Sequence, residues 1–297
     1  MQGTDSYTQS EDVLTYGTVI VGPIVALFKF TLFQKLVDRK IWLTLLLLAS
    51  PCALVLLIRN FALDNPPPLE RWEMYHVPVQ FLLIMVVTPL VCMVHGVSLI
   101  ATEVEGQTLV YLITRRMRRA TVLIVKFVAT ALVLVVLSDL AMVALHLCNL
   151  AGLDELTRQA ITGVHGGWDP SSDLQWYLLM TIPASVVGFL AIFTLVGMVT
   201  AKPLSLSIFY IIAGELILSN LPIGARVYSF MHQVRVMSAG HIPNVPYLYD
   251  LPVDLLPLYA ADKSGIPGFC GIVIVALGLS AVLVTMRELM PSKISRE

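Results

Sequence analysis

Long apolar stretches alternate with short polar ones along most of the chain. A membrane-spanning helix needs about 20 mostly apolar residues to cross about 30 Å of hydrocarbon. Six stretches meet or approach that length, and they predict six transmembrane helices at about 41–58, 77–100, 121–148, 175–200, 204–222 and 266–286. The pattern therefore predicts an all-α polytopic membrane protein whose transmembrane domain covers 41–286.

The composition agrees with a membrane location. Of the 297 residues, 57% are hydrophobic and 13% are charged, whereas about a quarter of the positions in a soluble domain are charged. The predicted spans leave no room for a large soluble catalytic domain. The formal net charge is −1, which gives no electrostatic footprint for nucleic acid. The expected surroundings are the lipid bilayer and protein partners.

Lysine and arginine are unequally divided between the two sides of the predicted membrane. If both termini lie on one side, that side carries thirteen of the 19 basic residues and the other carries six. Cytoplasmic loops of membrane proteins carry the excess of basic residues. The division predicts cytoplasmic termini, at 1–40 and at 287–297, in a protein of the plasma membrane or a bacterial inner membrane.

An apolar segment at 13–28 precedes the first predicted span. Gly17, Gly22 and Pro23 interrupt it, and it is shorter than a span requires. We expect an interfacial approach segment there, because a seventh span would place the N-terminus outside.

Residues 24–40 have an apolar face and a polar face at helical spacing. Phe30, Phe33 and Val37 share one face, and Lys35 lies on the other. Such a helix lies along the inner leaflet with its basic residues near anionic headgroups. We predict an N-terminal interfacial amphipathic helix; the alternative is a basic flank of the first span.

The longest predicted outer loop, 223–265, contains an apolar stretch that cannot be an ordinary span. Pro246, Pro252 and Pro257 interrupt 245–261, and a proline inside a helix removes a hydrogen bond and clashes with the preceding turn. A re-entrant or interfacial outer segment before the last span is expected.

Between the second and third predicted spans, on the cytoplasmic side, lies the polar segment 102–127. Glu103 and Glu105 stand near its start, and a dense group of basic residues extends from Arg115 to Arg119. Acidic residues suit a helix N-terminus, and basic residues suit the C-terminus and the lipid headgroups. The segment predicts a short amphipathic cytoplasmic helix that docks a partner; an ordinary basic loop is the alternative.

This segment resembles the signature of ABC type-2 permeases, the membrane subunits of ATP-binding-cassette exporters. Their pattern is close to E-x-E-x-G-T-L-x-x-L-L-x-x-P-x-x-R, with a lysine in the next span. The matching positions are Glu103, Glu105, Thr108, Leu109, Leu112, Ile113, Arg119 and Lys126. Gly106 stands one place before the usual glycine, and Arg116 replaces the proline. The order of amphipathic helix, six spans and elaborate outer segment is also similar to the family.

The resemblance implies that the chain is a permease subunit of an ATP-driven exporter. It implies that the segment between spans two and three is a coupling helix on a separate ABC ATP-binding subunit, and that two permease copies, identical or different, form the pathway. The implied contact residues are Glu103, Glu105, Gly106, Thr108, Leu109, Leu112, Arg115 and Arg119. The sequence contains no Gly-Lys pair, and so no P-loop motif. We therefore expect ATP and magnesium on the partner, and no catalytic, cofactor or metal site in this chain.

Three polar residues in the predicted spans are candidates for the transport pathway or the dimer contact: Asp139, His146 and Glu215. Ionisable side chains are costly in hydrocarbon unless they face a partner or water. Asp139 and His146 lie two turns apart on one helical face. Local hydrogen bonding between helices is the alternative explanation, and it is favoured for His146 and for His95 in the second span.

Two other functions suit a polytopic protein. An ion- or proton-coupled secondary carrier would use Asp139 and Glu215 to carry protons, but the paired halves typical of such carriers are not evident. An intramembrane enzyme would need His95 and His146 at one depth, whereas they are predicted near opposite surfaces. The four cysteines form no C-x-x-C pair and are expected to be small core residues.

Overall fold

The computed structural model describes residues 22–61, 77–105, 118–150, 170–200, 202–220, 228–239 and 266–286. Within these ranges all regular structure is helical, as predicted. The α-helices are α2 (Lys40–Phe61), α4 (Thr88–Glu105), α6 (Arg119–Leu150), α8 (Pro170–Val199), α9 (Pro203–Phe209), α10 (Phe230–Ala239) and α12 (Ile266–Met286). The π-helix η1 (Val77–Val87) leads into α4, and α9 continues through the π-helix η2 (Tyr210–Ile217) into the 3-10 turn η3 (Leu218–Asn220).

Five helices in the described part of the chain are long and apolar enough to cross a membrane: Lys40–Leu57, Leu82–Leu99, Arg119–Leu145, Thr181–Val199 and Ile266–Met286. They correspond to five of the six predicted spans, so the chain is a multi-pass membrane protein. The remaining prediction, 204–222, falls on a shorter apolar helix, Pro203–Ile217. A sixth crossing there stays a prediction.

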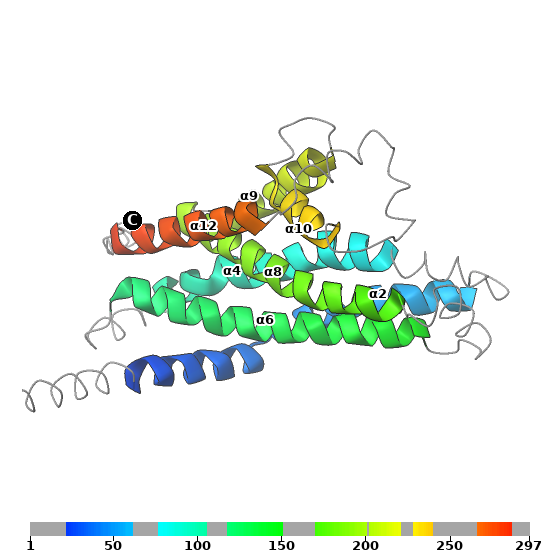
Figure 1. Cartoon of the computed structure of the whole chain (residues 1–297). Helices are drawn as coiled ribbons and strands as arrows, with labels where there is room; N and C mark the ends of the chain where they lie inside the picture. Colours follow the sequence, from blue (N-terminus) through cyan, green and yellow to red (C-terminus); the bar gives the residue numbers. More distant parts are fainter. Residues whose placement is uncertain are drawn as a thin grey trace, which may run out of the picture.

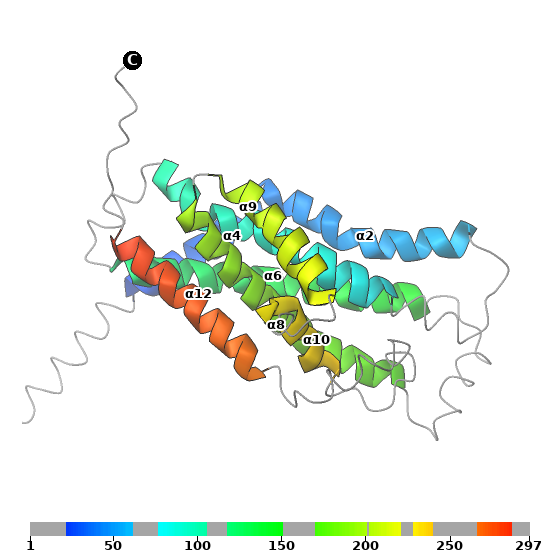
Figure 2. The same ribbon diagram turned by 90° about the horizontal axis from the view of Figure 1, so that it is seen from above.

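Helix α8 lies at the centre of the bundle. It packs against α4, α6, α10 and α12, and Figures 1 and 2 show these helices around it. Helix α2 lies against α6 and η1, on the side of the bundle opposite α12 (Figure 2). In the spanning parts of α4 and α8, 67% and 61% of the residues are buried, against 28% in α2 and 11% in α12. The α4–α8 pair is therefore the core, and α2 and α12 are peripheral.

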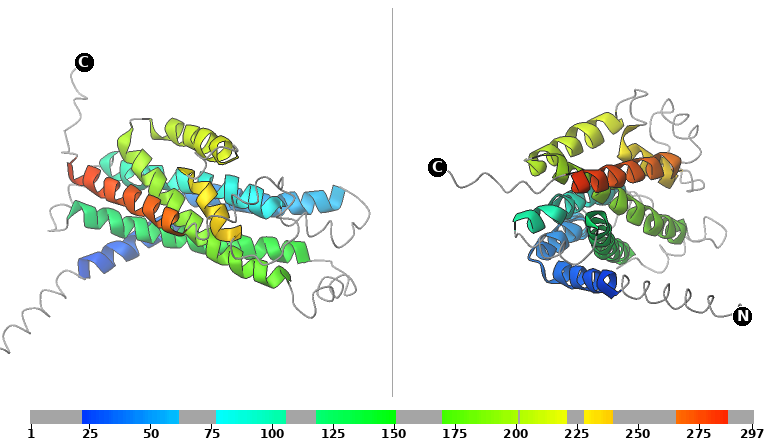
Figure 3. Two further views of the ribbon diagram at one scale, coloured as in Figure 1. Left: turned by 45° about the horizontal axis from the view of Figure 1, so that its top comes forward. Right: turned by 90° about the vertical axis from the view of Figure 1, so that its left-hand side faces the viewer.

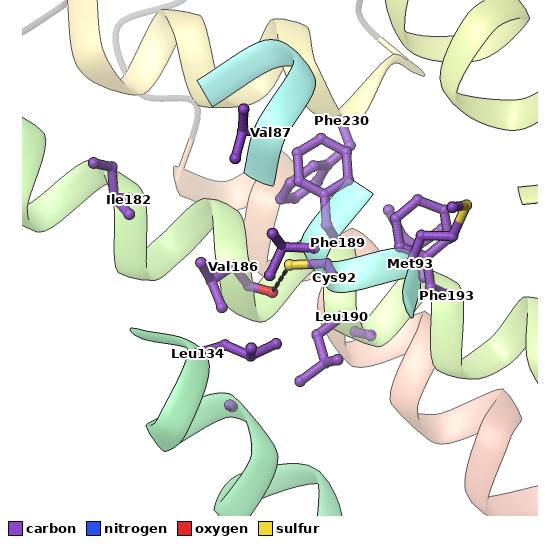
Figure 4. Close-up of a cluster of buried hydrophobic side chains, with 14 of the residues drawn as sticks. Val87, Cys92, Met93, Leu134, Ile182, Val186, Phe189, Leu190, Phe193 and Phe230 are labelled. Carbon is purple, nitrogen blue, oxygen red and sulfur yellow. Dashed lines mark hydrogen bonds between the residues drawn. The ribbon is translucent and has the colours of Figure 1, made fainter. Parts of the chain in front are cut away.

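Apolar side chains from several helices fill the core around α8. Phe189 packs edge-on against Phe230 of α10, with ring centroids 4.7 Å apart, and Phe193 makes an edge contact with Tyr210 of η2. The Cys92 thiol of α4 donates a hydrogen bond of 3.5 Å to the carbonyl oxygen of Val186 (Figure 4). Other core side chains in this view are Val87, Met93, Leu134, Ile182 and Leu190.

Glycines allow α4 and α8 to approach each other closely. A Cβ atom at Gly96 would lie 2.8 Å from the Cβ atom of Phe193, and one at Gly197 would lie 2.8 Å from the carbonyl oxygen of Val97. Small residues permit such close backbone contact between membrane helices. The absence of side chains at these two positions therefore sets the spacing of the core pair.

The segment before α2 is helical over residues 22–37 and lies at the edge of the bundle (Figure 3). Leu27 and Thr31 are buried against the bundle, whereas Phe30, Phe33 and Val37 are 64%, 69% and 66% exposed. The predicted helix is thus present, and its apolar face points away from the protein. An exposed apolar face of this kind suits lipid, although the placement of the helix on the membrane stays a prediction.

Helix α10 lies within the predicted outer loop 223–265, ahead of the proline-broken stretch 245–261. It packs against α8 and α12. A Cβ atom at Gly188 of α8 would collide with the Phe230 ring, and one at Gly268 of α12 would lie 2.7 Å from the Gln233 amide. The absence of side chains at these two glycines therefore leaves room for Phe230 and Gln233 of α10.

Several predictions concern parts of the chain outside the described residues. They are the polar N-terminus, most of 13–28, the coupling segment over 106–117, the stretch 245–261 and the tail 287–297.

Candidate functional site

A group of polar contacts within the bundle surrounds Glu215. This residue lies in η2, and its side chain is 1% exposed. The Ser229 hydroxyl and the Met231 backbone N–H each donate a hydrogen bond of 2.7 Å to Oε2. The Tyr210 hydroxyl donates to Oε1, and the Ser219 hydroxyl donates to the Glu215 carbonyl oxygen. We call these residues the Glu215 cluster.

The Glu215 cluster joins η2 to the N-terminus of α10, which lies beside it in Figure 2. Ser229 directly precedes α10, and its Oγ accepts a hydrogen bond of 3.5 Å from the His232 backbone N–H. The first N–H groups of a helix have no partner inside the helix, and the positive end of the helix dipole attracts a carboxyl group. Glu215 therefore acts as a cap supplied by another segment of the chain.

The sequence predicted Glu215 as a candidate site residue, but not its partners. Tyr210 precedes it by five residues, which is the spacing that a π-helix brings together. Ser229 stands before an apolar pair, a recognised signal for a helix start. That signal could have located α10, but it could not have shown that Glu215 lies against the same helix.

Asp139 lies on α6 and is half-buried. Its Oδ1 atom and the neighbouring Ser138 hydroxyl are buried without a hydrogen-bond partner among the described residues. The described partners of Glu215 come from η2 and α10, so the structure does not join the two carboxyl groups in one site. The backbone of His146 belongs to α6, and its side chain lies outside the described part.

His95 links α4 to α2. Its Nε2 atom lies 2.7 Å from the Thr44 hydroxyl, and both side chains are buried. The Thr44 hydroxyl also lies 3.0 Å from the carbonyl oxygen of Lys40, so it connects His95 to the backbone of α2. The expectation that His95 makes a local hydrogen bond between helices is confirmed.

The segment predicted to couple to an ATPase is only partly described. Glu103 and Glu105 belong to α4, which extends without interruption to Glu105, and Arg119 begins α6. The expectation that the two acids start a separate helix was wrong, because no proline or glycine interrupts the helix between Gly96 and Gly106. Gly106, Thr108, Leu109, Leu112 and Arg115 lie outside the described residues, as do the side chains of the two acids.

Comparison with known families covers this segment and most of the bundle. Residues 31–214 match the family described as ABC-2 family transporter protein. The match includes more than half of the 297-residue chain. The chain belongs to the ABC-2 family of transporters. No curated protein and no solved structure matches the chain. The resemblance found in 102–127 is thereby confirmed, and the chain is a membrane transport permease of this family.

Proposed function

We propose that this ABC-2 permease is the membrane-spanning subunit of an exporter driven by a separate ATP-binding subunit. The observation that carries the proposal is the family match over residues 31–214, which extends from the N-terminal helix through α2, α4, α6 and α8 into η2. The sequence offers no P-loop of its own. ATP and magnesium accordingly bind to the partner subunit, and this chain supplies the pathway.

The partner contacts the coupling segment between α4 and α6. Both flanking helices pack against α8, and the glycine contacts at Gly96 and Gly197 hold α4 tightly to it. If the partner displaces the segment, the movement would therefore be transmitted through α4 and α6 to α8 at the centre of the bundle. Glu103, Glu105 and Arg119 are the proposed contact residues closest to the two helix ends.

A second permease copy completes the pathway in this proposal. The peripheral helices leave large apolar surfaces uncovered in the single chain: Leu46 of α2 and Ile274 of α12 are both 69% exposed. Asp139 has a carboxyl oxygen without a described partner, which suits a contact with water or with the second copy. Asp139, His146 and Glu215 remain the proposed pathway or dimer-contact residues.

The proposed orientation places both termini in the cytoplasm. The basic residues are concentrated on that side. The coupling segment then faces the cytoplasm, where ATP is available to the partner.

A detergent pull-down of the tagged full-length chain from its native host tests the proposal. An ABC ATP-binding protein at near-equal stoichiometry is the expected companion. The double variant Glu103→Ala, Glu105→Ala should reduce its recovery, whereas Lys202→Ala should not. Lys202 is a suitable control because it is exposed and lies on the same predicted side of the membrane.

If no ATP-binding protein accompanies the folded chain in the presence of ATP, the proposal fails. Transport by the purified chain alone, driven by an ion gradient, would then identify a secondary carrier and direct attention to Asp139 and Glu215.

A further inference from the structure

One face of α6 carries a row of exposed apolar side chains. Helix α6 packs against α2, α4, α8 and α12, and Figure 1 shows it along one side of the bundle. The exposed side chains in its second half follow one another at intervals of three or four residues, so they lie on one helical face. They are Leu132, Val136, Leu140, Val143 and Leu147. We call them the α6 stripe, and in a membrane the stripe meets hydrocarbon.

Asp139 lies at the edge of the α6 stripe. Its side chain is half-buried. Val136, three residues before it, and Val143, four residues after it, are its neighbours on the helix surface. They are 50% and 38% exposed. The carboxyl group of Asp139 therefore borders an apolar surface that is open to the outside of the bundle.

The described part of the protein leaves this carboxyl group without a partner for Oδ1. After Lys126, α6 contains no lysine or arginine, and Lys126 lies 13 residues, or about 20 Å, along the helix from Asp139. Glu215, by contrast, accepts hydrogen bonds from three groups of the protein itself. The fold therefore satisfies Glu215 internally and leaves Asp139 to a partner from outside.

The residue next to Asp139 makes the same point independently. Ser138 is 1% exposed, and its hydroxyl has no hydrogen-bond partner among the described residues. Hydroxyl groups elsewhere in the bundle donate to a carbonyl oxygen four residues before them, as in Thr194 and Ser280. Two adjacent polar groups on α6 thus have unused hydrogen-bonding capacity beside an apolar surface.

We propose that this face of α6 binds a lipophilic cation. The apolar body of the ligand lies on the α6 stripe, and its positive charge lies against the Asp139 carboxylate. An ionised carboxyl group in hydrocarbon requires a partner or water, and its attraction for a cation is stronger where the dielectric constant is low. The stripe alone would accept any lipid chain, whereas the stripe and the acid together select molecules that are both apolar and cationic.

A second copy of the chain suits this face less well. In a two-fold dimer the same patch of each copy forms the contact, so a contact centred here would bring the two Asp139 carboxyl groups together. Like charges repel, and they repel most strongly in an apolar medium. Asp139 is thereby assigned to the pathway. As a statement of substrate class, this inference rests on the proposed transport function, but the binding itself requires no ATPase.

The test measures binding of radiolabelled tetraphenylphosphonium to the purified full-length chain in phosphatidylcholine nanodiscs, without an ATPase. Binding to empty nanodiscs is subtracted. The wild type should bind the cation saturably, and Asp139→Asn should bind it about tenfold more weakly. Tetraphenylborate, an anion of the same shape, should not bind more weakly to Asp139→Asn than to the wild type.

Two further variants keep the test decisive. Asp139→Glu retains the charge and should retain most of the affinity, which separates loss of the carboxylate from damage to the fold. Asp38→Asn removes one negative charge at the bend before α2 and should bind the cation as the wild type does. Absence of saturable binding to the wild type, equal affinity in Asp139→Asn, or an equal loss in Asp139→Glu or Asp38→Asn would overturn the proposal. The ATPase pull-down is a separate result, so either proposal can fail without the other.

Discussion

The core pair α4–α8 and the peripheral helices α2 and α12 have similar composition but are held in place differently. All four contain apolar spans. In α4 and α8, most residues of the span are buried and two glycines permit backbone contact. On α12, by contrast, a Cβ atom at Gly271 or Gly278 would meet nothing within 4 Å. Hydrophobicity places a helix in the membrane, whereas the shape of the helix surface determines how closely it packs against its neighbours and so where in the bundle it lies.

The largest difference in stability between the two regions is expected when the same substitution, isoleucine to alanine, is made in each of them. Ile182→Ala in α8 should lower the free energy of unfolding by about 4 kcal/mol, because Ile182 is fully buried and its loss leaves a cavity. Ile274→Ala in α12, at a side chain 69% exposed, should change it by less than about 0.5 kcal/mol. Unfolding of both variants in mixed micelles, followed by denaturing detergent titration, measures the difference. Equal effects would mean that α8 is not the core.

The Glu215 cluster should show the next largest effect. Glu215→Ala leaves the Ser229 hydroxyl and the Met231 N–H without their acceptor, and unpaired buried donors should lower stability by about 3 kcal/mol. Amide hydrogen exchange should rise in α10 before it rises in α4. Tyr210→Phe is the matched control, because it removes one donor and leaves the carboxyl group. Unchanged exchange in α10 would show that the cluster does not hold that helix.

The glycine contacts offer a third comparison. Gly197→Ala should lower the free energy of unfolding by about 2 kcal/mol, because the new Cβ atom would lie 2.8 Å from the backbone of α4. Gly278→Ala should be neutral or slightly stabilising, since alanine favours a helix and the site is open. The same titration distinguishes the two, and destabilisation by Gly278→Ala would contradict the peripheral position of α12.

The smallest effect is expected at the link between core and periphery. Thr44→Val keeps the size of the side chain but removes the partner of His95 Nε2. The loss of this hydrogen bond should lower the free energy of unfolding by about 1 kcal/mol. Thr285→Val is the control, because the Thr285 hydroxyl is exposed and bonds only within its own helix in the described contacts. Equal melting temperatures for the two variants would show that the Thr44–His95 bond does not hold α2.

Much of the architecture could be predicted from local patterns. The five long spans follow from apolar runs, and the two faces of the N-terminal helix follow from the spacing of Phe30, Phe33 and Val37. The family followed from the spacing of residues around Glu103, which the match over 31–214 supports. In each case the signal lies within about 20 consecutive residues, so it can be recognised without knowing the neighbours.

The candidate site was predicted only in part. Glu215 and Asp139 stood out because charged side chains are rare in apolar runs. Their different surroundings could not be foreseen, since Ser229 and the Met231 amide reach Glu215 from a helix that the apolar pattern does not mark. Likewise, the sequence pattern did not show that α4 continues as far as Glu105.

The sequence by itself determined that this chain crosses a membrane repeatedly and belongs among ABC-2 transporters, because hydrophobicity and motif spacing are local properties. Only the tertiary structure decided that α8 is central and that Glu215 caps α10. Lipid and the protein interior are equally apolar, so hydrophobicity alone does not show which face of a membrane helix is buried in the protein and which face contacts lipid. That choice depends on packing and hydrogen bonds between segments distant in the chain.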